Sequence, residues 1–462
     1  MKKRELLLLA AMMLAMFSFS GCKDKSSDDE KGTDSNSDTD TTVAWDTNHA
    51  PDDVGDFGEF AKPPGDMDVK KVPQFVSIGF DDNGFVDSMK WILDFMKDKK
   101  NSDGTPARLS FYNATGYYKD DPTIGGEKYT SLDTADPEKL AAVWLRAYTE
   151  GHEVGNHTQN HRQAFNFWGD YEKGWTADDW RHEISTCNDT LVEIGIPREE
   201  IVGFRTPFLG YNDDLFTVLK ELDMKYDCSI EEGWQYDQNG TNFNWPYDLK
   251  DGSQVDSLFL SWEPENTRET IGSHPGVWEM PMYPVVAPPD YKCAEYGIPA
   301  GLRTKMLKDV SYFGIEDGKV TGLDWNMVAG DEFSMNKAEV VATLKYTLDL
   351  RLKGNRAPFV WGAHTPNFSL DNTDFNPPNI TILELREALE EFITYALSKK
   401  DVIIIPQKDI LQWIQDHTPA DSDTATDSDT AATDTDSGTD SDTAATDTDS
   451  GTDSDTATDS AK

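Results

Sequence analysis

The positions of apolar residues divide the central part of the chain into strands and helices. A short, largely apolar run such as 73–80 (PQFVSIGF) predicts a buried strand, because a strand covered on both faces lacks the alternation of a half-exposed one. Apolar residues spaced three and four positions apart predict helices instead. By these patterns we expect strands at 73–80, 107–112 and 401–406, and helices near 89–96, 136–151, 184–194, 215–222 and 385–397.

Local signals and composition then suggest the fold class. One helix has clear ends, because Asp136 precedes Pro137, a residue favoured in a first helical turn, and Gly151 follows the last apolar position. Between about 230 and 335 the periodicity is weak, which indicates long loops or a small inserted subdomain. Elsewhere strands alternate with helices, as is typical of parallel βα units. We therefore predict an α/β fold, a (β/α) barrel with long loop insertions.

Both ends of the chain have compositions that cannot form a core. Residues 1–22 read as a basic start, a short apolar run and Ser-Gly-Cys22, which resembles the export signal and lipid-attachment cysteine of a bacterial lipoprotein. That run is too short for a membrane-spanning helix. Residues 23–56 and the Thr/Asp/Ser repeats of 419–462 are expected to be a disordered tether and tail. We expect one folded body, 57–418, exported and anchored to the bacterial cell envelope.

The charge and the cysteines of the body narrow its chemistry. The formal net charge is −43, of which the tail, the tether and the export signal carry −12, −8 and +2, so the body carries −25. So acidic a surface argues against nucleic acid and other polyanions, which need basic patches. Cys187, Cys228 and Cys293 remain besides Cys22. Export permits one disulfide among the three, and the sequence leaves the pair open.

Two pairs of polar residues stand near predicted strand ends. Asp81 and Asp82 follow the strand 73–80, and neighbouring side chains there point in different directions, so one carboxylate can bind a cation while the other faces a water. His157 and His161, in HTQNH, would present adjacent imidazoles if the chain turned helically after His157. Imidazoles and carboxylates are ligands that zinc prefers. Taken alone, such histidines are more often surface or capping residues, and such aspartates helix caps.

Two further candidates also follow apolar runs. Arg205 comes after IVGF, where a cation could hold a carboxylate ionised and oriented. The Thr-Pro-Phe turn after it could aim a backbone N–H at a developing oxyanion. His364 ends the apolar stretch RAPFVWGAH. Taken alone, a salt bridge that closes a loop and a hydrogen-bonded turn histidine are the simpler interpretations.

Together these four elements resemble the polysaccharide deacetylases, carbohydrate esterase family four. That family carries a strand ending in paired Asp, then His-Ser/Thr-x-x-His, then Arg-x-Pro-Tyr/Phe, then a late His. Here they stand in the same order as GFDDN, HTQNH, RTPF and GAH. The resemblance spans about residues 70–415 and is greatest to the chitin deacetylase-like branch, through segments such as YDCSI and GVWEMP. It implies the distorted (β/α) barrel of that family.

The resemblance also implies a divalent metal ion, with zinc as the first choice and cobalt or another divalent ion as alternatives. Its ligands would be Asp82, His157 and His161. His152 matches a position that does not ligate metal in the family, and it lies five residues before His157, so we interpret it as structural.

The remaining matches imply catalytic roles. Asp81 would be the general base, and Arg205 would orient it and stabilise its charge. The backbone N–H of Phe208 would bind the oxyanion. His364 would be the general acid that protonates the leaving amine.

Three residues are weaker candidates for contact with substrate. Trp245 and Trp278 are potential platforms for sugar rings, although buried core tryptophans are at least as common. Asp227 is a candidate for the acid that orients His364.

The chain departs from the family pattern in places. Gly79 stands where Thr or Ser is common, and Asn83-Gly84 replaces a frequent Gly-Pro or Ala. The segment after the late histidine, HTPNF, also differs from the usual setting. These departures leave the choice of substrate open.

The sequence favours a metal-dependent hydrolase that removes N-acetyl groups from an amino-sugar polysaccharide, whether chitin-like, peptidoglycan or exopolysaccharide. An O-acetyl esterase acting on xylan is a variant of the same class. A catalytically inactive, carbohydrate-binding surface lipoprotein and a non-haem iron oxygenase are alternatives from other classes. The expected partners are an acetylated polysaccharide and the membrane that holds the lipid anchor, without nucleic acid. We expect a monomer.

Overall fold

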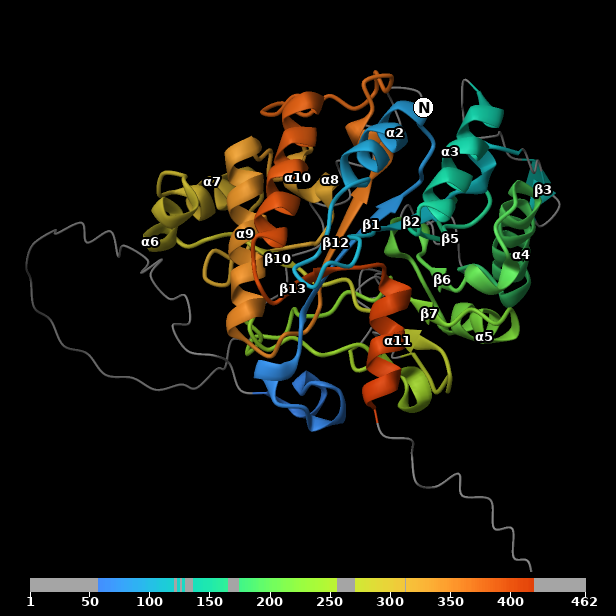
Figure 1. Ribbon diagram of the computed structural model, residues 1–462, viewed down its shortest axis with the longest axis horizontal. Coiled ribbons are helices and arrows are strands. Elements are labelled where there is room, and N and C mark those ends of the chain that lie inside the picture. Colours follow the sequence, from blue (N-terminus) through green and yellow to red (C-terminus); the bar gives the residue numbers. More distant parts are fainter. Residues whose placement is uncertain are drawn as a thin grey trace, which may run out of the picture. The chain divides into compact units, whose positions relative to one another are not determined.

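The fold is that of a computed structural model of residues 1–462 (Figure 1). It describes residues 57–119, 136–164, 174–255, 271–311 and 313–418, together with the backbone of two short strands, β3 (Thr123–Ile124) and β4 (Glu127–Lys128). All of these residues belong to one compact unit, Met1–Pro419. The predicted export signal with Cys22, the tether and the tail lie outside the described residues.

A curled, largely parallel sheet forms the centre of this unit. Its strands follow the order β12-β1-β2-β5-β6-β7-β9-β8, and β13 pairs with the first half of β1. Only the pair β8–β9 is antiparallel among the described strands of this sheet. The sheet curls into half a barrel, which confirms the predicted α/β fold of the distorted-barrel type. The strands are β1 (Gln74–Asp81), β2 (Ser110–Asn113), β5 (Glu153–Asn156), β6 (Gly203–Phe204), β7 (Tyr226–Asp227), β8 (Tyr247–Asp248), β9 (Trp278–Glu279), β12 (Phe359–His364) and β13 (Val402–Ile404).

Helices follow most of the parallel strands and pack against the sheet (Figure 1). The helix α3 begins where its sequence signal predicts, and α4 and α10 begin earlier than their apolar spacing predicts. The side chain of Asp136 caps α3, with Pro137 at its first position, and Thr176 and Thr381 form reciprocal caps with the acids three residues later in α4 and α10. The helices are α2 (Val86–Met96), α3 (Pro137–Thr149), α4 (Ala177–Ile194), α5 (Asp213–Glu221), α6 (Asp290–Cys293), α7 (Leu302–Asp309), α8 (Asp324–Val328), α9 (Lys337–Lys353), α10 (Ile382–Leu397) and α11 (Gln407–His417).

The central pair of strands sets the geometry of the sheet edge. Every residue of β1 is buried, as its largely apolar run predicts for a strand covered on both faces. β1 and β12 are parallel, in a register that places Asp81 opposite His364. On the other side of β1, β2 pairs with β5 up to the residues Asn113 and Asn156. The residues that follow these strands therefore gather at one edge.

The structure differs from the predicted elements in two regions. The stretch 230–335 is not a separate subdomain, because β9 and β8 continue the main sheet from β7, and β10 (Val285–Val286) pairs with β11 (Lys319–Val320) beside α9. The helix α9 was not predicted, since buried residues such as Val340, Thr343 and Leu344 lie on several of its faces. A helix buried on most sides lacks the apolar stripe by which a surface helix is recognised.

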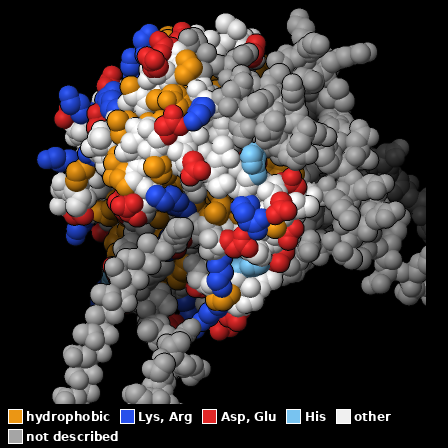
Figure 2. All heavy atoms as spheres, turned by 90° about the vertical axis from the view of Figure 1, so that its right-hand side faces the viewer, with side chains coloured by type: hydrophobic (Ala, Val, Ile, Leu, Met, Phe, Trp, Pro, Cys, Tyr) orange, Lys and Arg blue, Asp and Glu red, His pale blue; other side chains and the backbone are white. Residues whose placement is uncertain are grey.

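Three further observations concern the surface and the thiols. Cys187, Cys228 and Cys293 are buried free thiols, so the disulfide that export would permit is not formed among them. None of the helices in the described part of the chain combines the length and apolar character that a membrane crossing requires. Figure 2 shows acidic and basic side chains interspersed over the described part of one face, which spreads the excess of acid.

Candidate active site

Polar residues from four strands meet at the carboxyl edge of the sheet. Asp81 and His364 are the last residues of β1 and β12, His157 follows β5, and Arg205 follows β6. Parallel strands present their carboxyl ends at the same edge, which is where α/β barrels place their chemistry. The topology therefore brings together residues that lie up to 283 positions apart in the sequence.

Asp82, His157 and His161 form a cluster that can hold a metal ion. Oδ1 of Asp82 lies 2.9 Å from Nε2 of His161 and 3.8 Å from Nε2 of His157. One ligand atom from each residue lies within 4.8 Å of the others, and this is the only such cluster of acids, histidines and cysteines in the described residues. Oδ1 of Asp82 is buried without a well-aligned hydrogen-bond donor. An orphaned carboxylate oxygen and two converging imidazole nitrogens fit one divalent cation.

The protonation of His157 and Asp82 suits a metal, whereas the charge of Asp82 outweighs burial and raises the pKa of His161. Nδ1 of His157 donates a hydrogen bond to the backbone oxygen of Arg205 at 2.8 Å, so its Nε2 carries the lone pair. Burial lowers the pKa of His157 to about 4, which keeps the imidazole neutral at pH 7. Burial alone would raise the pKa of Asp82, but the adjacent His161 and the other histidines hold it well below its ordinary value. A neutral imidazole and an ionised carboxylate are the forms that bind metal.

The turn that carries the two histidines is not helical, so the rings do not come together through helical spacing. Thr158 and His161 adopt φ values of 66° and 47°, in the left-handed region. The side chain of Glu183 in α4 accepts hydrogen bonds of 2.8 Å from the backbone N–H groups of Gln159 and Asn160. Held by these hydrogen bonds, the turn places the centroids of the two imidazole rings 5.0 Å apart.

Backbone strain is concentrated at the strand ends of this site. The described residues include ten non-glycine residues with positive φ, and six of them lie in the turns after β1, β5 and β6. Such conformations cost on the order of 1–3 kcal/mol each and persist where the surrounding structure enforces them, often at functional sites. The six residues are Asp82, Asn83, Thr158, His161, Phe208 and Leu209.

The second aspartate of the pair has a different partner. Oδ1 of Asp81 accepts a hydrogen bond of 2.9 Å from Nη1 of Arg205, and both side chains are buried. Burial lowers the pKa of Arg205, but the charge of Asp81 outweighs it and the pKa is raised. The guanidinium also lies over the ring of Tyr112 at 4.6 Å and donates from Nε to the backbone oxygen of Cys228. The paired aspartates thus separate into one that faces the histidines and one that faces a fixed cation.

The glycine at position 79 makes room for this cation. A Cβ atom on Gly79 would lie 3.0 Å from Cε2 of Tyr112 and 3.1 Å from Nη1 of Arg205. Both distances are shorter than nearly all real Cβ contacts. A larger residue here would crowd the guanidinium that pairs with Asp81, so the absence of a side chain at position 79 leaves room for Arg205.

His364 is held by an aspartate that the sequence did not reveal. Its Nδ1 lies 2.7 Å from Oδ1 of Asp324, and its backbone N–H donates to Oδ2 of the same carboxylate at 3.0 Å. Burial lowers the pKa of His364, but the charge of Asp324 and this hydrogen bond, followed by Asp82 and Asp81, raise it to about 9. The imidazole is therefore protonated at neutral pH and can act as an acid.

Comparison with known proteins shows what this edge is similar to. Residues 68–226 match the model of the polysaccharide deacetylase family. This segment contains both aspartates, both ligand histidines and Arg205, whereas His364 and Asp324 lie beyond it.

Known relatives extend the similarity beyond this segment. The chain is 23% identical over 363 residues to chitin deacetylase 8 of Bombyx mori, covering 78% of this chain and 74% of that protein. It is 27% identical over 173 residues to chitin deacetylase 1 of Bombyx mori, covering 36% of this chain and 27% of that protein. A Mycobacterium smegmatis protein solved as a candidate polysaccharide deacetylase aligns over 77% of this chain and 96% of its own, with 15% identity and a TM-score of 0.43.

Asp227 does not orient His364 in the structure. Its carboxylate accepts hydrogen bonds from the backbone N–H and the hydroxyl of Ser229, at 2.8 and 2.9 Å. The hydroxyl of Ser229 in turn accepts from the backbone N–H of Thr206. Burial raises the pKa of Asp227 to about 6. The prediction was wrong because Asp324 occupies the place beside His364, and Asp227 instead supports the turn after β6.

The tryptophans predicted as sugar platforms are largely or partly buried. Trp245 is 3% exposed, and its Nε1 donates to the backbone oxygen of Asn355. Trp278 is half-buried in β9 and packs against the same core cluster. Burial rules out Trp245 as a platform, since a stacking sugar needs an open ring face. Phe208 is the exposed aromatic at the site, 44% accessible, with its ring 5.1 Å from that of His161.

Replacing Asp324 by asparagine should shift the pH dependence of any catalysis in which His364 is the acid. Asparagine can still accept hydrogen bonds from His364, but it lacks the charge that raises the pKa of the imidazole to about 9. The pKa should therefore fall towards or below 6.5, and the acid form should be lost at lower pH. In profiles of kcat/KM against pH, we expect the basic limb to move by at least about one pH unit towards acid.

The control for this prediction is Asn367→Ala, which removes a neutral donor to Oδ2 of Asp324 and leaves the carboxylate charged. Its basic limb should stay close to that of the wild type. An unchanged limb in Asp324→Asn would mean that His364 is not the acid that the profile reports.

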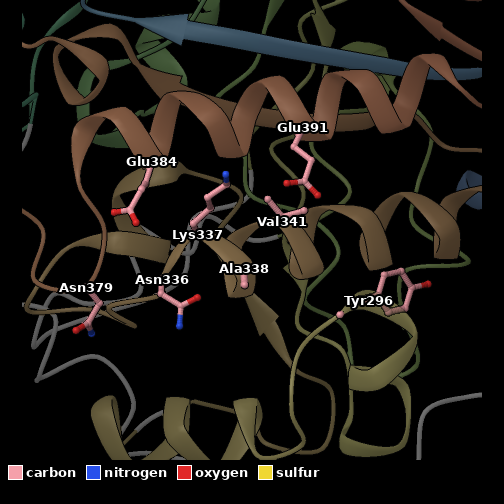
Figure 3. Close-up of a pocket in the computed structure, with 9 residues that line it drawn as sticks. Tyr296, Asn336, Lys337, Ala338, Val341, Asn379, Glu384 and Glu391 are labelled. Atoms are coloured by element: carbon pink, nitrogen blue, oxygen red, sulfur yellow. The ribbon is translucent and has the colours of Figure 1, made fainter.

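Away from this site, a hollow with a volume of about 460 Å³ lies between α9 and α10 (Figure 3). Figure 3 shows Glu384 and Glu391 on α10 and Asn336 at the start of α9 along its wall. Its polar groups are engaged in the fold, since Asn336 and Glu384 cap the two helices and Lys337 pairs with an acid of α10. None of its lining residues belongs to the cluster at the sheet edge.

Proposed function

We propose that this protein is a metal-dependent hydrolase that removes N-acetyl groups from an amino-sugar polysaccharide. The observation that carries the proposal is the division of labour at the sheet edge. Asp82 faces two imidazole nitrogens, Asp81 is paired with a buried arginine, and His364 lies opposite Asp81 in register. Deacetylation of an amide needs these three functions: a cation site, a base and an acid for the leaving amine.

The base and the acid are assigned from their partners. Asp81 accepts a proton from the attacking water, and Arg205 holds its carboxylate in place through the 2.9 Å contact. His364, protonated at neutral pH and fixed by Asp324, donates its proton to the amine as it leaves. Each group thus begins the reaction in the protonation state that its step requires.

The cation site and the turn after β6 complete the arrangement. When bound, a divalent cation such as zinc supplies a more acidic water and polarises the acetyl carbonyl. Asp82, His157 and His161 would hold it, as the converging donor atoms fit such an ion. The backbone N–H of Phe208, in a turn supported by Ser229 and Asp227, is proposed to stabilise the oxyanion.

The choice of an amino-sugar polymer rests on several supports. Two curated relatives are named chitin deacetylases, and the exposed ring of Phe208 beside His161 offers an apolar surface for a sugar. An O-acetyl esterase on xylan would use the same groups, but it would not need an acid as strongly held as His364, since an alkoxide leaves more readily than an amide nitrogen. An inactive carbohydrate-binding protein would have no use for the Asp324–His364 pair. Export and lipid attachment through Cys22 remain part of the proposal on the sequence alone.

A screen of acetate release tests this function. The purified body, residues 57–418, is incubated with zinc or cobalt and with chitooligosaccharides, peptidoglycan fragments or acetylxylan oligomers. We expect acetate and free amine in equal amounts from one of the first two. Acetate from acetylxylan alone would make the protein an esterase, and tight binding of a glycan without acetate release would make it a binding protein.

A further inference from the structure

Tyr117 is a second aromatic residue fixed close to the metal-ligand cluster. It ends a short 3-10 helix, η4 (Thr115–Tyr117), that follows β2. The backbone N–H groups of Thr115 and Gly116 donate to the backbone oxygens of Thr158 and Gln159, at 3.3 and 2.6 Å. These acceptors lie between the two ligand histidines. The position of Tyr117 is therefore tied to the turn that carries His157 and His161.

The ring of Tyr117 lies against the backbone just after the paired aspartates. A Cβ atom on Gly84 would lie 2.7 Å from Cζ of Tyr117, and closer still to Cε1 and Cδ1. Real Cβ atoms essentially never make such contacts. The φ angle of Gly84 is outside the left-handed range, so its backbone does not require glycine. The absence of a side chain at position 84 instead admits the tyrosine ring.

The hydroxyl of Tyr117 is available to a ligand. Within the part of the chain that the structure describes, no side chain forms a hydrogen bond with it, and the residue is half-buried rather than enclosed. A phenol is protonated at neutral pH and can donate a hydrogen bond.

We propose that the hydroxyl of Tyr117 positions the sugar unit that carries the acetyl group, by donating a hydrogen bond to one of its ring hydroxyls. This inference rests on the proposed function, which places the acetyl group at the metal-ligand cluster and its oxygen at the turn after β6. The ring of Tyr117 packs against Gly84, two residues after Asp82, and its helix is bonded to the histidine turn, so we expect it to meet the part of the substrate next to the acetyl group. Tyr117 is thus a positioning residue rather than a part of the acid–base chemistry.

The test compares a sugar substrate with one that lacks a sugar. In Tyr117→Phe the ring still fills the space beside Gly84, and only the hydroxyl is lost. We expect kcat/KM for a chitooligosaccharide to fall about three- to tenfold, as for the loss of one neutral hydrogen bond. Hydrolysis of 4-nitrophenyl acetate and the metal content should not change. Gly84→Ala, which displaces the ring, should lower activity on the oligosaccharide by at least as much.

The matched control is Tyr118→Phe, the same change at the neighbouring half-buried tyrosine, which should leave both activities unchanged. Equal oligosaccharide kinetics in Tyr117→Phe and the wild type would overturn the proposal, and so would an equal loss on 4-nitrophenyl acetate. Oligosaccharide affinity, measured in an Asp81→Asn background that does not turn over, decides the matter even if the wild type releases no acetate. If the wild type releases no acetate, the proposed function fails, and the affinities still test the role of Tyr117. A weaker affinity in the double variant than in Asp81→Asn supports the role of Tyr117. Equal affinities in the two variants, or no detectable affinity already in Asp81→Asn, overturn it.

Discussion

Replacing Asp81 by asparagine is expected to lower kcat/KM for acetate release by at least about 100-fold, because a positioned general base typically contributes 10²–10⁴-fold. Asparagine keeps the size of the side chain, and its amide oxygen can still accept from Nη1 of Arg205. It cannot take a proton from water at neutral pH. Metal content should equal that of the wild type, since the ligand atoms belong to other residues.

The variant will also be less stable, because it leaves the fully buried charge of Arg205 without its counterion. Removing one partner of a buried ion pair costs about 3–5 kcal/mol. Denaturant unfolding should therefore be followed beside activity, and the assay run where the variant is folded. The matched variant is Asp82→Asn, which should lose metal affinity and keep the Asp81–Arg205 pair. A folded, metal-loaded Asp81→Asn protein with wild-type activity would show that another group is the base.

Replacing His157 by alanine is expected to abolish both metal binding at micromolar zinc and acetate release. Hydrogen-bond partners of metal ligands commonly contribute 10–100-fold to metal affinity, and a direct ligand should contribute more. The substitution also leaves the backbone oxygen of Arg205 without its donor, next to Asp81. Zinc titration followed by calorimetry and metal analysis of the dialysed protein measure the effect.

His152 provides the control for this experiment. It is another buried histidine next to β5, but its Nδ1 accepts a hydrogen bond from the backbone N–H of Leu109 at 3.0 Å. Burial lowers its pKa to about 3, so it stays neutral. His152→Ala should cost stability and leave one zinc per chain. Stoichiometric zinc in His157→Ala, or loss of zinc in both variants, would contradict the assignment of ligands.

Much of the sheet edge could be predicted because its residues are encoded locally. An apolar run that ends in two acids, as at Asp81 and Asp82, indicates within a few positions that a strand is buried and where that strand ends. Arg205 and His364 also follow apolar runs, so their place at a strand end could be read in the same way. Parallel topology then brings such ends together without any further information in the sequence.

Asp324 could not be predicted because its function depends on a contact between distant segments. It lies 40 residues before His364, in a stretch whose apolar spacing is weak, at the start of the five-residue helix α8. A single acid before Trp325 is a common sequence feature. The bridge between Leu323 and Gly362 carries Asp324 to β12, and only the folded chain shows this.

The conformation of the turn from His157 to His161 and the burial of the tryptophans could not be predicted for a related reason. The four-residue spacing of the two histidines is compatible with a helical turn. Instead Thr158 and His161 have φ angles in the left-handed region, and Glu183, more than twenty residues away, holds the backbone between them by hydrogen bonds. Trp245 has the composition of a sugar platform, yet it fills a core beside Trp413. Local sequence gives the type of a side chain, whereas its exposure is decided by distant packing.

The most direct test of the account is reconstitution of the wild-type body with metal. The protein is stripped with a chelator, dialysed and titrated with zinc, while acetate release from a chitooligosaccharide is followed. We expect no activity in the stripped protein and a linear return that ends at one zinc per chain, as a single cluster of Asp82, His157 and His161 requires. Full acetate release by the metal-free protein would contradict the account.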